Sequence, residues 1–202
     1  MQREARSERS RRQVLDAALR LFSRRGFRGT TVRDIADEAR VSTGNVYHHF
    51  PDKESIFRTL LDEFRGITEA KRYPFTRALL AGRFPDDIEQ LGMSARESVR
   101  EFRQYIALIY VDVIEFEGTH IQQFYADMGQ RIAAVLGEER LEAIKSRMRP
   151  NVSPIFALLL TSRIFFNYFS IQILFNVPEP FGKDSATVVR EITDILRNGM
   201  LL

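Results

Sequence analysis

Seven consecutive residues, TGNVYHH at 43–49, carry an unusual density of hydrogen-bonding groups. Hydroxyl, amide and imidazole groups of this kind donate to phosphate oxygens and to the edges of nucleic-acid bases, and a glycine lets a backbone come close. Val46 and the following Phe50 are spaced to form one apolar face on a short helix. The polar positions are Thr43, Gly44, Asn45, Tyr47, His48 and His49. The run predicts a helix with a buried side and a polar side suited to a nucleic-acid groove.

A second helix is expected immediately before this one. Val32, Ile35 and Ala39 follow the spacing of one buried helix face. Thr31 with Asp34 three residues later is typical of a capping box, in which each side chain satisfies a free backbone N–H. The pattern breaks at residues 40–42, where Ser42 or Thr43 can cap the next helix. Two short helices joined by a tight turn predict a helix-turn-helix, with the second helix entering the major groove.

Flanking residues extend the candidate DNA-binding set. Lys53 combines an ammonium group with the free backbone N–H groups of a helix start, a combination that favours phosphate. Thr30 and Arg33 are candidates for the backbone of the opposite strand, although a solvated surface role for Arg33 is an equal alternative. The complete candidate set is Thr30, Thr31, Arg33, Ser42, Thr43, Gly44, Asn45, Tyr47, His48, His49 and Lys53.

The spacing Ile35-Ala36-x-x-Ala39-x-Val41-Ser42-x-Gly44-x-x-Tyr47-x-x-Phe50, followed by Lys53-Glu54, resembles the DNA-binding signature of the tetracycline-repressor (TetR) family of bacterial regulators. The segment 14–26, VLDAALRLFSRRG, is similar to the first helix of that family. The resemblance covers roughly residues 10–60. It implies an operator-binding regulator, with repression favoured over activation, and a tyrosine at position 47 that touches the DNA backbone.

Charge is distributed unevenly along the 202 residues. Residues 1–60 hold 13 Lys and Arg against 8 Asp and Glu, whereas residues 61–202 hold 17 against 19. A basic head on a slightly acidic body is typical of a domain that faces phosphate. Residues 1–9, which include Arg6 and Arg9, are expected to form a flexible basic arm that follows DNA or stays a disordered tail.

The body after the head also reads as helical, and no strand pattern competes anywhere, so the fold class is all-α. Helices are expected from a capping box at Ser94, from Ser153-Pro154, and over about 184–198. Fifteen of the 21 residues in 155–175 are apolar, which raises the question of a membrane span. Arg163 near the centre favours a helix buried within protein, because a lipid-facing arginine is costly.

Aromatic and polar residues on these helices are candidates for a ligand cavity, although an aromatic stripe is more often ordinary core. The resemblance implies that this domain binds a small effector. The candidates are Phe102, Tyr105, Ile109, Tyr110, Phe124, Tyr125, Arg163, Phe166 and Asn167. Arg163 and Asn167 lie one turn apart and serve either a ligand or a dimer interface. The expected ligand is largely apolar.

The last two long helices carry more apolar surface than one small body can hide, and two copies are expected to form a four-helix interface. Candidate dimer residues are Phe165, Phe169, Val188, Ile192, Ile195 and Leu196. The chain has no cysteine, and none of His48, His49 and His120 has the i, i+4 partner of a zinc-binding helix. No metal, cofactor or catalytic residue is expected.

These observations predict an N-terminal helix-turn-helix domain over 1–52 and a larger helical domain for effector binding and dimerisation over 53–202. The fourth helix, about 53–64, is the only rigid link expected between them. The predicted protein is a cytoplasmic homodimer that binds double-stranded operator DNA and a small effector. A helical scaffold or protein-interaction module without DNA binding is the leading alternative, and a membrane-anchored protein is a third.

Overall fold

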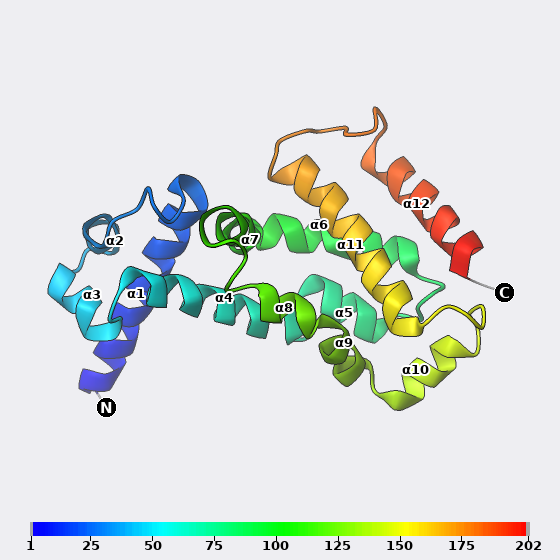
Figure 1. The fold of residues 1–202 in the computed structure, drawn as a ribbon, viewed down its shortest axis with the longest axis horizontal. Coiled ribbons are helices and arrows are strands. Elements are labelled where there is room, and N and C mark those ends of the chain that lie inside the picture. The colour runs from blue at the N-terminus through cyan, green and yellow to red at the C-terminus, as the bar shows by residue number, and fades with distance from the viewer. Residues whose placement is uncertain (1, 201–202) are drawn as a thin grey trace. The chain divides into compact units, whose positions relative to one another are not determined.

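The computed structural model describes residues 2–200, with side chains from residue 4 onward. These residues form helices without a β-strand (Figure 1), which confirms the all-α prediction. The helices are α1 (Gln2–Arg25), α2 (Val32–Ala39), α3 (Thr43–His49), α4 (Lys53–Glu69), α5 (Pro74–Ala81), α6 (Ile88–Glu101), α7 (Arg103–Phe116), α8 (Gln122–Ala126), α9 (Met128–Leu136), α10 (Glu138–Lys145), α11 (Pro154–Ile173) and α12 (Ser185–Met200).

The chain folds into two compact units. The first contains the chain through Gly66 together with Gln104–Gln123, and the second contains Ile67–Arg103 together with the chain from Phe124 onward. The chain passes from one unit to the other within α4, at the start of α7 and within α8. The boundaries of the compact units thus differ from the predicted domain boundary at residue 52. That functional boundary stays a prediction. The chain crosses between the units through α7 as well as α4, so α4 is not the single link expected from the sequence.

The prediction of a flexible arm was wrong for residues 2–9, which form the first turns of α1. Residues 1–25 contain neither glycine nor proline, and they are rich in arginine, with alanine and leucine, all of which favour helices. The helix ends at Arg25, and Gly26 follows with φ of 75°, a left-handed conformation that glycine adopts without steric cost. Residue 1 lies outside the described residues.

The core of the first unit joins α1 to the two short helices and to α4. Leu15 and Phe22 of α1, Ile35 of α2 and Phe57 of α4 are among its fully buried side chains. Leu108 of α7 belongs to the same core. Residues 104–123 are therefore structural partners of the helix-turn-helix although they lie far from it in sequence.

In the second unit α11 packs closely on α6, and Gly92 makes this possible. A Cβ atom at Gly92 would lie 2.8 Å from Cε1 of Phe165 and 3.0 Å from Cγ1 of Val189. The helix expected to begin at Ser94 begins at Ile88 instead, and the buried Ser94 hydroxyl donates to the carbonyl of Leu91. The capping pattern was misleading because packing against α11 carries the helix through this point.

Helix α11 has the length and apolar composition of a membrane span, which is weak evidence by itself, and 44% of its most apolar window is buried. Ser153 caps it and Pro154 occupies its first turn, as predicted. Phe165 and Phe169 are fully buried in the second unit. Burial of these residues is the behaviour of a core helix.

We predict that Gly92→Ala destabilises the protein by about 1–3 kcal/mol, because the added methyl overpacks the α6–α11 contact. Gly66→Ala is the matched control, since Gly66 lies in helix α4 with no atom within 4 Å of an added Cβ. The control should be neutral or more stable by about 0.5–1 kcal/mol, the difference in helix propensity. Urea unfolding monitored by circular dichroism measures both. Equal effects of the two substitutions would show that the contact is loose.

Candidate DNA-binding site

Local capping sets the geometry of the two short helices. The Thr31 side chain accepts a hydrogen bond from the backbone N–H of Asp34, and the Asp34 carboxylate accepts one from the backbone of Thr31 at 2.8 Å. The Thr31 hydroxyl also lies 2.5 Å from this carboxylate, and these hydrogen bonds lower the pKa of Asp34. Arg40 adopts φ of 57° at the end of α2, and Ser42 then caps α3. The predicted helix-turn-helix is present, with α2 and α3 side by side (Figure 1).

One side of α3 is buried and the other is open. Val46 and Phe50 lie in the core of the first unit. Tyr47 is 56% exposed. Thr43, Gly44 and His48 share this exposure, as do Thr31, Arg33 and Ser42 nearby. The structure therefore brings together at the surface seven of the eleven residues in the candidate set.

His49 lies on the side of α3 that is half-buried. Burial lowers its pKa, and electrostatic repulsion from His48 and Arg11 adds to this effect. Its Nε2 atom is buried and has no hydrogen-bond partner within the described residues. The neutral imidazole is favoured here, so His49 is better suited to packing than to binding phosphate.

Thr30 does not lie on the DNA-facing surface. It is fully buried, and its hydroxyl donates to the carbonyl of Gly26 at 2.9 Å. The prediction of a phosphate contact by this side chain was wrong. Its hydroxyl instead satisfies a carbonyl at the end of α1, where backbone acceptors lack helical partners.

The Lys53 side chain also forms its hydrogen bonds within the protein. Its ammonium donates to the carbonyls of Phe27 and Thr30, both at 2.7 Å, and lies 4.1 Å from the centre of the Phe27 ring. Burial lowers the pKa of Lys53, while the carboxylates of Glu115 and Asp34 act in the opposite direction. The ammonium thus holds the α1–α2 loop, residues 26–31, instead of projecting freely toward phosphate.

Because Lys53 donates to two carbonyls, we predict that Lys53→Met lowers the free energy of unfolding by about 2 kcal/mol, as expected for hydrogen bonds from a charged group. Lys71→Met is the control, because Lys71 is exposed. Chemical denaturation compares the two variants. An unchanged stability together with a weaker salt dependence of DNA binding would restore the phosphate role and contradict the structural one.

Four contacts of acidic side chains, which the sequence did not predict, tie α7 and the turn after it to this site. The Glu115 carboxylate accepts from the backbone N–H groups of Phe27 and Arg28, at 2.9 and 2.6 Å. The fully buried Asp112 lies 2.6 Å from Nδ1 of His120, whose Nε2 lies 3.4 Å from Glu54. The partners of Glu115 and Glu54 lie 66 to 88 positions away, so no local pattern could have revealed those contacts, whereas Asp112 and His120 are eight positions apart.

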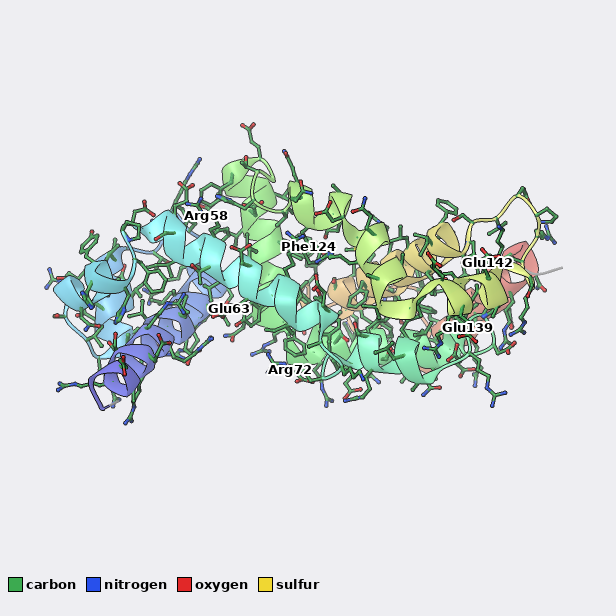
Figure 2. The ribbon with its side chains drawn as sticks, turned by 90° about the horizontal axis from the view of Figure 1, so that it is seen from below. Arg58, Glu63, Arg72, Phe124, Glu139 and Glu142 are labelled. Atoms are coloured by element: carbon green, nitrogen blue, oxygen red, sulfur yellow. The ribbon has the colours of Figure 1, made fainter. Side chains whose placement is uncertain are left out.

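Glu63 of α4, labelled in Figure 2, joins α1 to α7 in the same unit. Arg12 donates to both of its carboxylate oxygens at 3.0 Å, and the Tyr105 hydroxyl donates to one of them at 3.2 Å. The Tyr105 ring stacks on Phe64 with ring centres 5.4 Å apart. This candidate ligand residue is thus engaged in the first unit, which also contains Ile109 and Tyr110.

The six other ligand candidates lie in the second unit. Phe102 and Phe166 contact Tyr73, with ring centres 5.2 and 6.5 Å away. Phe124, labelled in Figure 2, contacts Tyr125 edge to face. The Arg163 guanidinium lies 5.3 Å from the centre of the Tyr125 ring. Arg163 and Asn167 are both exposed on α11. Their exposure within one chain favours the interface reading of this pair over the ligand reading.

Most candidate dimer residues are not at the surface of the subunit. Phe165, Phe169, Val188 and Leu196 are buried inside the second unit, so the expectation that they meet a partner was wrong. Ile195 is 72% exposed and Ile192 is partly exposed. The exposed stripe of α11 consists instead of Phe156, Leu160, Arg163 and Asn167. An apolar helix cannot reveal from sequence which side faces its own core.

Comparison with known proteins finds a family whose model matches the helix-turn-helix segment. Residues 14–60 match the family described as "Bacterial regulatory proteins, tetR family". The chain is 52% identical over 60 residues to the HTH-type transcriptional repressor KstR2 of Rhodococcus jostii, covering 28% of this chain and 29% of the relative. It is 39% identical over 100 residues to KstR2 of Mycobacterium tuberculosis, covering 45% and 49%. The matches thus span less than half the length of these relatives.

The fold comparison extends further. The crystal structure of NalD, the secondary repressor of the MexAB-OprM multidrug efflux pump in Pseudomonas aeruginosa, matches with a TM-score of 0.63 at 21% identity. The match covers 98% of both chains, and at this identity it establishes likeness of fold. The helix-turn-helix and the sequence match over 14–60 agree, so the N-terminal segment is similar to the DNA-binding segment of the tetR family, and the chain as a whole shares the fold of the NalD repressor.

Proposed function

We propose that this protein is a transcriptional repressor of the TetR type that binds duplex operator DNA through α3. The observation that carries the proposal is the open polar side of α3, formed by Thr43, Gly44, Tyr47 and His48 opposite the buried Val46. The similar KstR2 proteins are named as transcriptional repressors. In a helix-turn-helix the first turns of the second helix reach base edges in the major groove.

Tyr47 offers the simplest test of DNA contact. A phenol donates to a phosphate oxygen while its ring packs on protein, so this contact positions the protein without reading sequence. We predict that Tyr47→Ala and Tyr47→Phe both weaken binding to selected and unrelated duplexes alike, by roughly tenfold for one lost charge-assisted hydrogen bond. Fluorescence anisotropy with labelled duplexes over a salt series measures this.

The salt series also separates the alternatives. DNA binding by the wild type should weaken steeply as salt rises, because bound phosphates release counterions. A helical scaffold that binds a protein partner would show no such binding to duplex DNA. Unchanged affinity in both Tyr47 variants, with circular dichroism intact, would contradict the docking of α3.

A homodimer completes this proposal. Two-fold symmetry presents two recognition helices to half-sites separated by about one or more turns of DNA. The exposed apolar side chains Phe156 and Leu160 on α11 and Ile195 on α12 support an interface on these helices. Arg163 lies on the same stripe of α11 and supplies a polar group at its edge.

We predict that Ile195→Glu converts the dimer to a monomer and abolishes operator binding, because a carboxylate would be buried without a partner. Ala186→Glu is the control, since Ala186 is also exposed on α12 but nine residues away, on the opposite side of the helix. Sedimentation velocity at micromolar concentration measures assembly. A monomeric wild type that still binds a palindromic duplex would contradict the dimer.

The effector proposal concerns a small, largely apolar molecule bound among aromatic residues of the second unit. Two aromatic groups of this unit support it: Phe102 and Phe166, whose rings lie 5.2 and 6.5 Å from that of Tyr73, and Tyr125, whose ring meets Phe124 edge to face. An effector controls DNA binding only if it favours one arrangement of the two heads over another. Calorimetry with apolar compounds, with and without Phe166→Ala, tests this, and equal affinity in both proteins would place the ligand elsewhere.

Regulators of this family are generally non-enzymatic and cytoplasmic, and we place this protein with them. We expect it to need no metal or cofactor. Recovery of the full chain in the soluble fraction without detergent tests the cytoplasmic assignment against the membrane-anchored alternative.

A further inference from the structure

Asn45 differs from its neighbours on α3 because its side chain already has a partner. The Ser10 hydroxyl on α1 donates to Oδ1 of Asn45 at 2.5 Å, in a partly buried contact between residues 35 positions apart. Asn45 itself is half-buried, whereas Thr43, Gly44 and Tyr47 are exposed. The amide oxygen of Asn45 therefore faces α1, and its NH₂ group is left for another acceptor.

The surroundings hold this arrangement in place. The backbone N–H of Asn45 donates to the capping hydroxyl of Ser42 at 3.1 Å, which fixes the residue in the first turn of α3. One residue after Ser10, the Arg11 guanidinium lies 5.2 Å from the centre of the Phe50 ring. Phe50 is buried in the core at the end of α3. Helix α1 is thus fixed against both ends of α3, and Ser10 cannot drift away from Asn45 without breaking these contacts.

We propose that Ser10 determines which base Asn45 reads, by holding the amide oxygen and leaving only the NH₂ donor for DNA. The proposal rests on the proposed function, in which α3 enters the major groove. A free asparagine pairs with adenine through two hydrogen bonds, accepting from N6–H and donating to N7. The Ser10 hydroxyl occupies one of the two lone pairs of Oδ1 and holds this oxygen toward α1, which disfavours the accepting half of that pairing. The NH₂ donor finds two acceptors on guanine, O6 and N7, whereas adenine offers only N7 beside its own N6–H₂ donor and thymine offers only O4.

Selection from a pool of randomised duplexes, using the full-length protein, tests this assignment. The wild type should enrich guanine at one position of each half-site, and Asn45→Ala should lose the preference at that position. Ser10→Ala frees Oδ1, so it should shift the same position toward adenine and bind the wild-type sequence roughly five- to tenfold more weakly. Ser10→Thr keeps a hydroxyl donor and should retain the guanine preference.

Ser23→Ala is the matched control, because the Ser23 hydroxyl lies on the same helix but donates to the carbonyl of Arg20 within it. It should select the same sequences as the wild type. If Ser10→Ala fails to fold, as judged by circular dichroism, Ser10→Cys replaces it, since a thiol is a weak donor of similar size.

Three results would overturn the proposal while leaving DNA binding intact. The wild type could enrich adenine at the position that depends on Asn45, Asn45→Ala could leave every preference unchanged, or the Ser10 variants without a hydroxyl could keep the guanine preference. A wild type that enriches no sequence at all would instead remove the proposed function, and this inference with it.

Discussion

The arrangement of the first unit depends on how the α1–α2 loop, residues 26–31, is held. A cation and an anion satisfy its backbone from different elements: Lys53 of α4 donates to the carbonyls of Phe27 and Thr30, and Glu115 of α7 accepts from the N–H groups of Phe27 and Arg28. Thr30 is fully buried, and a buried backbone group left without such a partner would cost about 1–3 kcal/mol. Because this loop directs the chain into α2, the same contacts orient the helix-turn-helix.

These contacts with the α1–α2 loop explain why the end of α7 belongs to the first unit. Between Asp112 and His120 the chain contributes Glu115 to the loop and a buried carboxylate–imidazole pair that reaches Glu54. Helix α7 lies beside the α1–α2 loop (Figure 1). A shift of α7 would therefore move the loop and the helices that follow it. Helices α4 and α7 both cross the boundary between the two units and both contribute to these contacts.

The sequence predicted correctly those features that depend on interactions between residues close together in the chain. The capping box of Thr31 and Asp34 and the apolar spacing of α2 and α3 act within a few residues, so they predicted the helix-turn-helix correctly. The sequence did not predict roles that depend on distant partners. The ammonium of Lys53, for example, donates to carbonyls 23 and 26 positions away. The predicted helix start at Ser94 was wrong for the opposite reason, because packing in the second unit overrode a local capping signal. Phe165 was misassigned because α11 is apolar on nearly every side.

Lys53 and Glu115 together hold the α1–α2 loop rigidly within the first unit. Native-state hydrogen exchange of the backbone N–H groups of Phe27 and Arg28 measures it most directly. We expect both amides in the wild type to exchange as slowly as core amides of α1, and to lose most of that protection in Glu115→Ala while the α1 core keeps its own. Rapid exchange of both amides in the wild type, at the rate of an open surface loop, would contradict the account.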